Sequence, residues 1–236
     1  MKKICLSIVI YNEQDGLKKT LNKIFNYFQK RKLNYEFWIF DNNSSDNSRN
    51  IIKTNFSNKK IRYFKQKKNM GYAYNNYSAI KVPDADLYII MDGDGQYDPK
   101  DIDRFLKMSN NYDLILGYRK KRKDPIFRIL ASKILNVFSN FIIKSDAVDI
   151  NCGYKLLSKR LAKSIRFKYF YNYINPEIYV FAKKKGFPIA NISVKHYARK
   201  GGVSVFNGNI NFAKNVFLMI RYLIKLRLNY VKKEKK

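Results

Sequence analysis

The chain has little cysteine and histidine, the side chains that build disulfide frameworks and most zinc sites. Its 236 residues contain two cysteines, Cys5 and Cys152, and one histidine, His196. The cysteines are far apart and form no CxxC pair, so no disulfide framework is indicated and a reducing cytoplasm suits the chain. A single histidine also excludes an HExxH motif, and we therefore expect no zinc site.

Long apolar runs and the common nucleotide-binding motifs are missing too. The apolar run at residues 4–10 is too short for a signal peptide, and we expect no segment to reach the uninterrupted apolar length that spans a bilayer. The sequence has no GxxxxGKS/T motif and no GxGxxG motif after its first predicted strand. P-loop ATPases and ordinary dehydrogenases are thereby excluded.

Acidic residues are scarce, because 18 Asp and Glu oppose 48 Lys and Arg and leave a formal net charge of +30. Such an excess predicts an anionic partner, which can be a nucleic acid, a lipid headgroup or a phosphorylated substrate. AT-rich coding explains part of the excess equally well. The hydrophobic content of 46% excludes a disordered polycation, since that much apolar surface can form a core.

Apolar runs of strand type alternate with helical patterns in the first half of the chain. Strands are predicted at residues 5–10, 36–40, 61–64, 87–91 and 113–116, with helices at 17–28, 47–56, 73–82 and 99–108. This alternation is typical of repeated βαβ units. The predicted fold class is therefore α/β, a mostly parallel, Rossmann-like sheet flanked by helices.

Two later segments, residues 126–144 and 212–230, have the pattern of basic amphipathic helices. In the first, one face carries Leu130, Ile134, Val137, Phe138 and Phe141, and another carries Arg128, Ser132 and Asn136. In the second, an apolar stripe of Phe212, Val216, Met219, Leu223 and Leu226 lies opposite Lys214, Arg221 and Lys225. Polar and charged residues interrupt the first, so we expect it not to span a membrane. Such helices lie in a membrane interface or pack on their own domain.

Three of the predicted strands end in polar clusters, at residues 11–13, 41–46 and 92–96. Ligands bind at the carboxyl ends of parallel strands, so the clusters are expected to share one edge of the sheet. Each cluster alone is explained by turn formation and helix capping, but three on one edge favour a site. Asp41 can accept a hydrogen bond from a base or ribose, and Tyr11 can stack on a base. A helix cap and a core aromatic are the alternatives for these two residues.

Asp92 and Asp94 are two residues apart at the end of a predicted buried strand, where extended backbone would point both carboxylates to one side. A divalent cation removes their repulsion and leaves coordination positions for a diphosphate, and Gln96 can add a neutral oxygen. An EF-hand is the competing metal site. Its loop requires Gly at the sixth position and Glu at the twelfth, where this chain has Tyr97 and Asp103.

Seven motifs follow one another along the chain: LSIVIYNEQDG (6–16), DNNSSDNS (41–48), NMGYA (69–73), MDGDGQYDP (91–99), GYRKKRKD (117–124), DINCGYK (149–155) and HYARKGGVS (196–204). In this order and spacing the chain resembles the family-2 glycosyltransferases of GT-A fold, and within them the polyprenyl-phosphate group typified by dolichol-phosphate mannose synthase. We accordingly expect a GT-A domain at residues 1–206 and a basic amphipathic helix and tail at residues 207–236.

The resemblance also implies roles for individual residues. The nucleotide-sugar donor would be held by Tyr11, Glu13, Asp41, Asp92 and Gly93. The cofactor, Mg²⁺ or Mn²⁺, would be bound on the donor diphosphate by Asp92, Asp94 and Gln96. The acceptor phosphate would be received by Arg122, Arg128 and Ser132. The catalytic residues would be Asp94, Arg119 and Arg199, with Arg119 on the acceptor side and Arg199 near the donor diphosphate.

The predicted activity is metal-dependent, inverting transfer of a sugar from a GDP- or UDP-sugar to a polyprenyl (dolichyl or undecaprenyl) phosphate. The protein is expected to be cytoplasmic, peripheral at the inner face of an anionic membrane, with no nucleic acid partner and no specified oligomeric state. A phosphate acceptor is already ionised near neutral pH and needs no general base. Transfer to a saccharide hydroxyl is the first alternative, and it needs a base, for which Glu177 is the candidate. Stabilisation of a helix start after Pro176 explains that glutamate equally well.

Two further alternatives stay open. A basic nucleic-acid-binding protein is the distant one, because it leaves the ordered motifs unexplained. A non-catalytic member of the family is the other, and the altered first loop is the argument for it. Three departures from the family pattern leave the identity of the donor open. The Pro and the following residue that usually precede YNE are deleted, Asn42 and Asn43 replace the common Asp-Gly, and Tyr72 stands where Lys is frequent.

Overall fold

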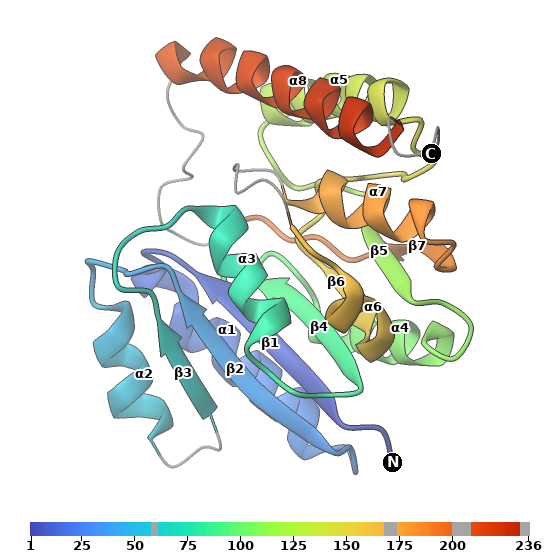
Figure 1. Cartoon of the computed structure of the whole chain (residues 1–236). Helices are drawn as coiled ribbons and strands as arrows, with labels where there is room; N and C mark the ends of the chain where they lie inside the picture. The colour runs from blue at the N-terminus through green and yellow to red at the C-terminus, as the bar shows by residue number, and fades with distance from the viewer. Residues whose placement is uncertain (58–60, 168–173, 200–208, 232–236) are drawn as a thin grey trace.

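The computed structural model describes residues 1–57, 61–167, 174–199 and 209–231. Within them, seven strands form one sheet in the order β3-β2-β1-β4-β6-β5-β7 (Figure 1). The strands are β1 Ile4–Ile10, β2 Tyr35–Asp41, β3 Ile61–Lys65, β4 Leu87–Asp92, β5 Leu114–Arg119, β6 Lys155–Ser158 and β7 Ile189–Val194. The helices are α1 Gln14–Gln29, α2 Ser48–Phe56, α3 Tyr72–Lys81, α4 Ile102–Met108, α5 Ile126–Ile143, α6 Lys159–Ser164, α7 Asn175–Lys184 and α8 Asn209–Val231, with a 3₁₀ turn η1 at Pro99–Asp101.

The sheet is mostly parallel. Neighbouring strands run parallel except at β6, which pairs antiparallel with both β4 and β5. The predicted α/β class is confirmed, and every strand and helix predicted in the first half of the chain is present with ends shifted by a few residues. The sequence patterns did not predict β6, because four residues are too few to show a periodicity.

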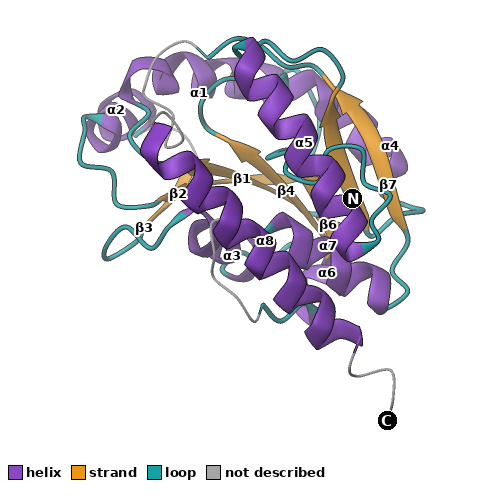
Figure 2. Ribbon diagram, turned by 90° about the horizontal axis from the view of Figure 1, so that it is seen from above, coloured by secondary structure: helices purple, strands orange, loops and turns teal. Residues whose placement is uncertain are grey.

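Two layers of helices cover the sheet. The central strand β1 is buried on both faces, as a parallel strand between helices must be. Ile4, Leu6 and Ile8 alternate toward one face, where they pack with α1, α2 and α4, whereas Cys5 and Val9 share the other core with α3, α6, α7 and α8. Figure 2 shows the layers on either side of the strands. The carboxyl ends of β1, β2 and β4 therefore meet at one edge, and the three polar clusters follow them.

Helix α8 packs on the rest of the chain through its apolar stripe. Met219, Leu223 and Leu226 are fully buried in the core that also contains α7. Arg227 donates a hydrogen bond to the carbonyl of Ile142 in α5 at 3.0 Å. The structure describes no side chain for Phe212, Lys214, Val216 or Ser204. The expected domain boundary at residue 206 also lies outside the described residues. Such a helix was expected either to lie in a membrane interface or to pack on its own domain, and α8 packs on its own domain.

Helix α5 turns its apolar face outward instead. This face comprises seven exposed side chains: Ile126, Phe127, Leu130, Ile134, Val137, Phe138 and Phe141. By length and composition α5 is apolar enough to cross a bilayer, with a mean hydropathy of 1.5 over 18 residues, so the expectation that no segment reaches that length was wrong. Its polar face is nevertheless engaged, because Asn136 donates to the carbonyl of Val148 and accepts from the N–H of Ile150. These bonds fasten α5 to the segment before β6.

Candidate active site

The DGDGQ loop, residues 92–96, follows β4 at the shared edge. The strand ends at Asp92, and the next residues form a turn in which Gly95 has a φ of +76°. The expectation of two carboxylates on one extended strand was therefore wrong, because a turn brings Asp94 near Asp92. Burial and then the Asp92 charge raise the pKa of Asp94 to about 6. Gly93 packs on β1, where a Cβ would lie 2.4 Å from Cγ2 of Ile10, so a larger residue would displace the turn.

Asp92 is surrounded by residues from α3, from β6 and from the loop before β6. Its Oδ1 accepts a hydrogen bond from the Tyr72 hydroxyl at 3.2 Å. Gly153 makes room for the carboxylate, because a Cβ at that position would lie 1.9 Å from Asp92 Oδ2. Lys155 on β6 is 0% exposed, and burial raises the pKa of Asp92 while the Lys155 charge opposes the rise. Tyr72 thus gives a hydrogen bond where the family often has lysine, and Lys155 supplies the positive charge from another strand.

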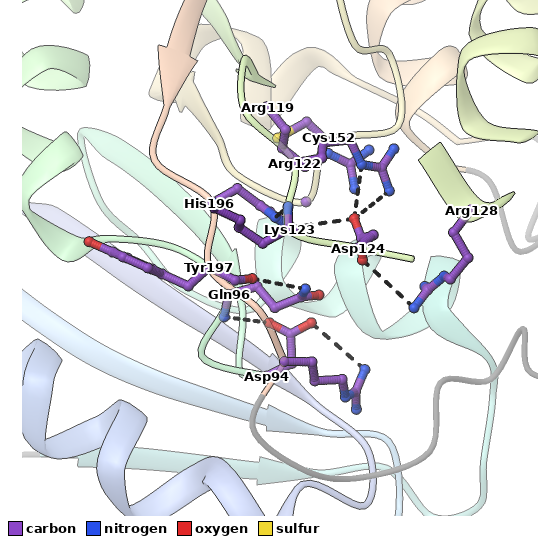
Figure 3. Close-up of polar contacts among 12 residues, drawn as sticks. Asp94, Gln96, Arg119, Arg122, Lys123, Asp124, Arg128, Cys152, His196 and Tyr197 are labelled. Carbon is purple, nitrogen blue, oxygen red and sulfur yellow. Dashed lines mark hydrogen bonds and ion pairs between the residues drawn. The ribbon is translucent and has the colours of Figure 1, made fainter. Parts of the chain in front are cut away.

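Asp94 and Gln96 are the candidate cation ligands. Asp94 Oδ1 accepts a hydrogen bond from the backbone N–H of Gln96 at 3.0 Å, and the Gln96 side-chain amide donates to the carbonyl of Tyr197 at 3.2 Å (Figure 3). Asp94 Oδ2 and the Gln96 amide oxygen are hard ligands of the kind that Mg²⁺ and Mn²⁺ prefer. The described residues contain no group of three His, Cys, Asp or Glu side chains that could hold a metal. A cation here would therefore take its remaining ligands from a diphosphate or water.

Arg199 connects two acids of the site. Its Nη2 donates to Glu13 Oε1 at 2.7 Å, and its Nη1 lies 3.8 Å from Asp94 Oδ2. Burial raises the pKa of Glu13 to about 8, although the Arg199 charge opposes the rise. Residues of the first, fourth and last motifs thus meet in one place. The guanidinium group of Arg199 supplies the positive charge that a phosphate-binding site needs.

The shortened first loop is joined closely to the second. The Asn12 N–H donates to Ser44 Oγ at 3.0 Å, Asn12 Oδ1 accepts from the Ser45 N–H at 2.9 Å, and the Glu13 N–H donates to Ser48 Oγ at 3.0 Å. Asn12 has a φ of 53°, a left-handed conformation that asparagine tolerates. The deletion before YNE is therefore accommodated by a compact turn fastened to the second loop.

Asp41 already has hydrogen-bond donors on both carboxylate oxygens. Its Oδ1 accepts from the N–H and the hydroxyl of Ser44 at 2.8 and 2.6 Å, and its Oδ2 accepts from the Tyr63 hydroxyl at 2.5 Å. Asp41 is 0% exposed, so in this conformation its carboxylate organises the second loop rather than facing a ligand. Tyr11, by contrast, is partly exposed after β1, as a residue that stacks on a base must be.

The substituted residue Asn42 links the second and third motifs. Its side-chain amide donates to Asn69 Oδ1 at 2.7 Å, and its Oδ1 accepts from the Met70 N–H at 2.9 Å. Asparagine provides both a donor and an acceptor for these two bonds. The departure from the common Asp-Gly pair therefore has a structural use that the sequence reasoning missed.

The basic loop, residues 118–124, and the start of α5 carry the residues that were expected to receive the acceptor phosphate. Arg122 Nη2 and Arg128 Nη1 lie 2.8 and 3.7 Å from the carboxylate oxygens of Asp124, as Figure 3 shows. Ser132 follows Arg128 by one helical turn and is partly exposed. The residues expected to receive an acceptor phosphate are thus brought together, with two of them on one carboxylate.

Arg119 has its own acidic partner. Its Nε donates to Asp149 Oδ2 at 2.6 Å and its Nη2 donates to Asp149 Oδ1 at 2.9 Å, a planar two-point pairing. Both side chains are largely buried, at 12% and 13% exposure. A bidentate pair of this kind fixes the plane of the guanidinium group.

The single histidine lies between the basic loop and Tyr97, which follows the DGDGQ loop. His196 Nδ1 accepts from the backbone N–H of Lys123 at 3.3 Å, and its ring lies edge-on to Tyr97 at 5.7 Å between centroids. Its Nε2 is 4.0 Å from Asp124. Burial lowers the pKa of His196 to about 4, although Asp124 opposes the shift. The imidazole is therefore neutral near pH 7.

Three contributors to the site escaped the sequence reasoning: Asp124, Asp149 and Lys155. All three lie inside motifs that the sequence displays, GYRKKRKD and DINCGYK. The sequence does show that Asp124 is an acidic residue at the end of a basic loop, and this was the signal that could have identified it. Nothing in the sequence pairs it with a particular arginine.

Comparison with known proteins agrees with these motifs. Residues 5–166 match the sequence profile described as Glycosyl transferase family 2. An undecaprenyl-phosphate 4-deoxy-4-formamido-L-arabinose transferase of Photorhabdus laumondii is 27% identical over 176 residues, which are 70% of this chain and 52% of that protein. A protein of the same name from Proteus mirabilis is 28% identical over 139 residues, 58% of this chain and 43% of that protein. The chain spans about half the length of these curated relatives.

Solved structures share the fold. Mannosyl-3-phosphoglycerate synthase from Rubrobacter xylanophilus matches with a TM-score of 0.70 at 15% identity, over 97% of this chain and 75% of that one. Glucosyl-3-phosphoglycerate synthase from Mycobacterium tuberculosis, in complex with Mn²⁺, UDP-glucose and phosphoglyceric acid, matches with a TM-score of 0.65 at 13% identity, over 97% and 79%. At such identities the likeness concerns the fold alone.

Proposed function

The chain belongs to glycosyl transferase family 2 and has the GT-A fold, and on this premise we propose that it transfers a sugar from a nucleoside-diphosphate donor to a polyprenyl phosphate with the help of Mg²⁺ or Mn²⁺. The observation that carries the proposal is the meeting of Asp94 and Gln96 with several arginines at one sheet edge. The printed names of the curated relatives, undecaprenyl-phosphate sugar transferases, support the acceptor class. The fold neighbour in complex with Mn²⁺ and UDP-glucose supports the cofactor and donor class.

On the donor side, the cation held by Asp94 and Gln96 would neutralise the diphosphate that leaves. Arg199 is 3.8 Å from Asp94 and would exchange its contact with Glu13 for a phosphate oxygen of the donor. Tyr11 would stack on the base above the joined first and second loops. These residues bind and orient the donor, and the anomeric carbon would face the acceptor side.

On the acceptor side, Arg119, Arg122 and Arg128 would orient the phosphate. One acceptor oxygen attacks the anomeric carbon from the face opposite the diphosphate, so the new C–O bond forms as the bond to the nucleoside diphosphate breaks. This single displacement inverts the configuration at the anomeric carbon. Because the attacking oxygen is already anionic near neutral pH, no side chain has to remove a proton.

The rival transfer to a saccharide hydroxyl needs a base in contact with the acceptor. Glu177 was the candidate, and it lies in the first turn of α7 with 0% exposure. A base must come within hydrogen-bond reach of the hydroxyl, at about 3 Å. A glutamate without exposed surface suits the role of stabilising the start of α7 better, which favours the phosphate acceptor.

Attachment to the inner face of an anionic membrane is the second part of the proposal. The outward apolar face of α5 begins directly after the basic loop, whose Lys120, Lys121 and Lys123 are exposed. An apolar helix face beside lysines suits an interface of acyl chains and anionic headgroups. The polyprenyl chain would then stay in the lipid while its phosphate reaches the arginines.

The test is sugar transfer by the purified chain from a panel of GDP- and UDP-sugars to farnesyl phosphate, with farnesol as the matched acceptor that lacks only the phosphate. We expect transfer to farnesyl phosphate alone, and its loss on removal of the cation by EDTA. The Asp94→Ala variant should lose at least about a hundredfold in turnover, while Asp84→Ala, a change at an exposed acid, should not.

Two results would contradict the proposal in different ways. Transfer to farnesol or to a saccharide, without transfer to farnesyl phosphate, would favour the hydroxyl acceptor. If calorimetry finds no binding of GDP or UDP with Mn²⁺ to a folded protein, the non-catalytic alternative gains.

A further inference from the structure

Asp124 ends the basic loop and sits among three basic side chains. Its side chain is 3% exposed. Arg122 contacts one oxygen through Nε at 2.9 Å and Nη2 at 2.8 Å, and Arg128 approaches the other through Nη1 at 3.7 Å. His196 completes the surroundings with Nε2 at 4.0 Å. Figure 3 shows the two arginines reaching Asp124 from different directions.

The two arginines need this carboxylate in order to lie near each other. Guanidinium groups at short range repel, and the repulsion grows as water is excluded from around them. His196 is neutral at pH 7 and adds no positive charge. The single negative charge of Asp124 attracts both guanidinium groups and weakens the repulsion between them, and its contacts with Arg122 and Arg128 restrict both side chains before any ligand arrives.

Arg122 keeps donors for a ligand. A guanidinium group has five N–H bonds, and the contacts to Asp124 occupy Nε and Nη2 of Arg122. The Nη1 N–H groups of Arg122 keep a fixed direction, because the two contacts hold the plane of the group, whereas Arg128 is attracted to Asp124 as an ion pair at 3.7 Å. An arginine positioned in this way loses less conformational freedom when it binds a phosphate.

We propose that Asp124 is a positioning residue that holds Arg122 and Arg128 as a preformed pair for the phosphate of the acceptor. The inference rests on the proposed function, since the pair has this role only if the acceptor carries a phosphate. Asp124 does not contact the acceptor and takes no part in bond making. It acts through the two arginines, and its removal therefore weakens acceptor binding more than donor binding.

The first experiment compares Asp124→Asn, which keeps the shape and removes the charge, with Asp84→Asn as the matched control. Asp84 is 75% exposed and pairs with Lys159 and Lys163, far from the basic loop in sequence. For Asp124→Asn we expect the Kd of farnesyl phosphate and the acceptor KM to rise about tenfold, the effect of losing one charged hydrogen bond. The Kd of the nucleotide with Mn²⁺ should change by less than about twofold. Asp84→Asn should leave every value unchanged.

A double-mutant cycle separates positioning from a general structural role. In an Arg122→Ala/Arg128→Ala background, Asp124→Asn should add no further loss of farnesyl phosphate affinity, because the groups it positions are gone. A further loss in that background would overturn the proposal. Unchanged or tighter farnesyl phosphate binding by the single variant Asp124→Asn would overturn it too, since a carboxylate that competes with the phosphate gives that result.

A second variant serves if Asp124→Asn does not fold. Arg122→Lys keeps the charge and loses the two-point contact with Asp124. We expect it to weaken farnesyl phosphate binding about tenfold, and unaltered binding would contradict the proposal. If the wild-type chain itself binds no farnesyl phosphate, the proposed acceptor fails and the inference fails with it. If the wild type binds but the variants bind equally well, the inference alone fails.

Discussion

Lys155 places a fully buried ammonium group beside Asp92, across the antiparallel pairing of β6 with β4. In the ladder Lys155 is opposite Ile90, two residues before Asp92. Among the described residues its ammonium donates one hydrogen bond, to the carbonyl of Gly153 at 3.5 Å. Burial lowers the pKa of Lys155 and the Asp92 charge opposes the fall, so each charge stabilises the other.

This relationship predicts non-additive stability. Lys155→Met removes the positive charge that stabilises the Asp92 carboxylate most, and Asp92→Asn leaves the ammonium without its carboxylate. We expect each single variant to lose about 2 kcal/mol of unfolding free energy in urea denaturation. The double variant should lose less than the sum of the two, because it removes both charges. Additive losses would mean that the two groups act independently.

Gly153→Ala is expected to displace Asp92. The new Cβ would lie 1.9 Å from Asp92 Oδ2, so the carboxylate or the backbone must move. We expect a loss of about 3 kcal/mol in unfolding free energy and of sugar transfer. Gly16→Ala is the matched control, because the nearest atom to its Cβ is 3.9 Å away and alanine favours the helix. Equal stability of the two variants, measured by urea denaturation, would contradict the tight packing at Gly153.

The neutral His196 predicts a pH dependence of stability. Its pKa in the folded chain is about 4, below the ordinary histidine value of 6.5. Between these values the unfolded chain binds a proton that the folded chain does not, so stability falls as pH falls through this window. From pH 7 to pH 5 this contribution falls by about 2 kcal/mol. The His196→Asn variant has no imidazole and lacks this pH-dependent contribution. We therefore expect the difference in unfolding free energy between wild type and variant to shrink by about 2 kcal/mol from pH 7 to pH 5. A difference that stays constant from pH 7 to pH 5 would contradict a buried neutral imidazole.

The outward face of α5 predicts where the protein meets a membrane. Phe127 and Phe141 are 65% and 79% exposed, so their replacement by Asp should leave folding intact. We expect the double variant to bind phosphatidylglycerol vesicles at least about tenfold more weakly in co-sedimentation, because two aromatic side chains no longer enter the lipid. Val82→Asp, at a 42% exposed apolar residue that follows α3, is the control. Equal binding by all three proteins would show that α5 does not enter the interface.

Much of the fold and of the site was predictable from the sequence. The alternation of strand and helix patterns predicted the parallel sheet. Apolar side chains recur every two residues in a strand and every 3.6 residues in a helix, and both repeats can be seen over short stretches of sequence. The same reasoning placed the three polar clusters at one edge, and the motifs indicated the family and the residues to examine. The amphipathic patterns of α5 and α8 were equally visible.

What each pattern packs against was decided by the tertiary structure. The helices α5 and α8 have similar apolar stripes, yet Leu223 is buried whereas Phe141 is exposed, because the core beside α7 lies under α8. The turn at Gly93 and Gly95, rather than extended strand, sets the position of Asp94, since β1 lies against it.

The amino-acid sequence by itself determined the fold class, the family and the types of residue that meet at the site. The tertiary structure alone decided the charge pairs that organise it. Arg119 and Asp149 are 30 residues apart, and Glu13 and Arg199 are 186 apart. Local periodicity carries no information over such separations, whereas the energy of an ion pair depends on distance and on the water around it. Only folding brings these groups together and removes that water.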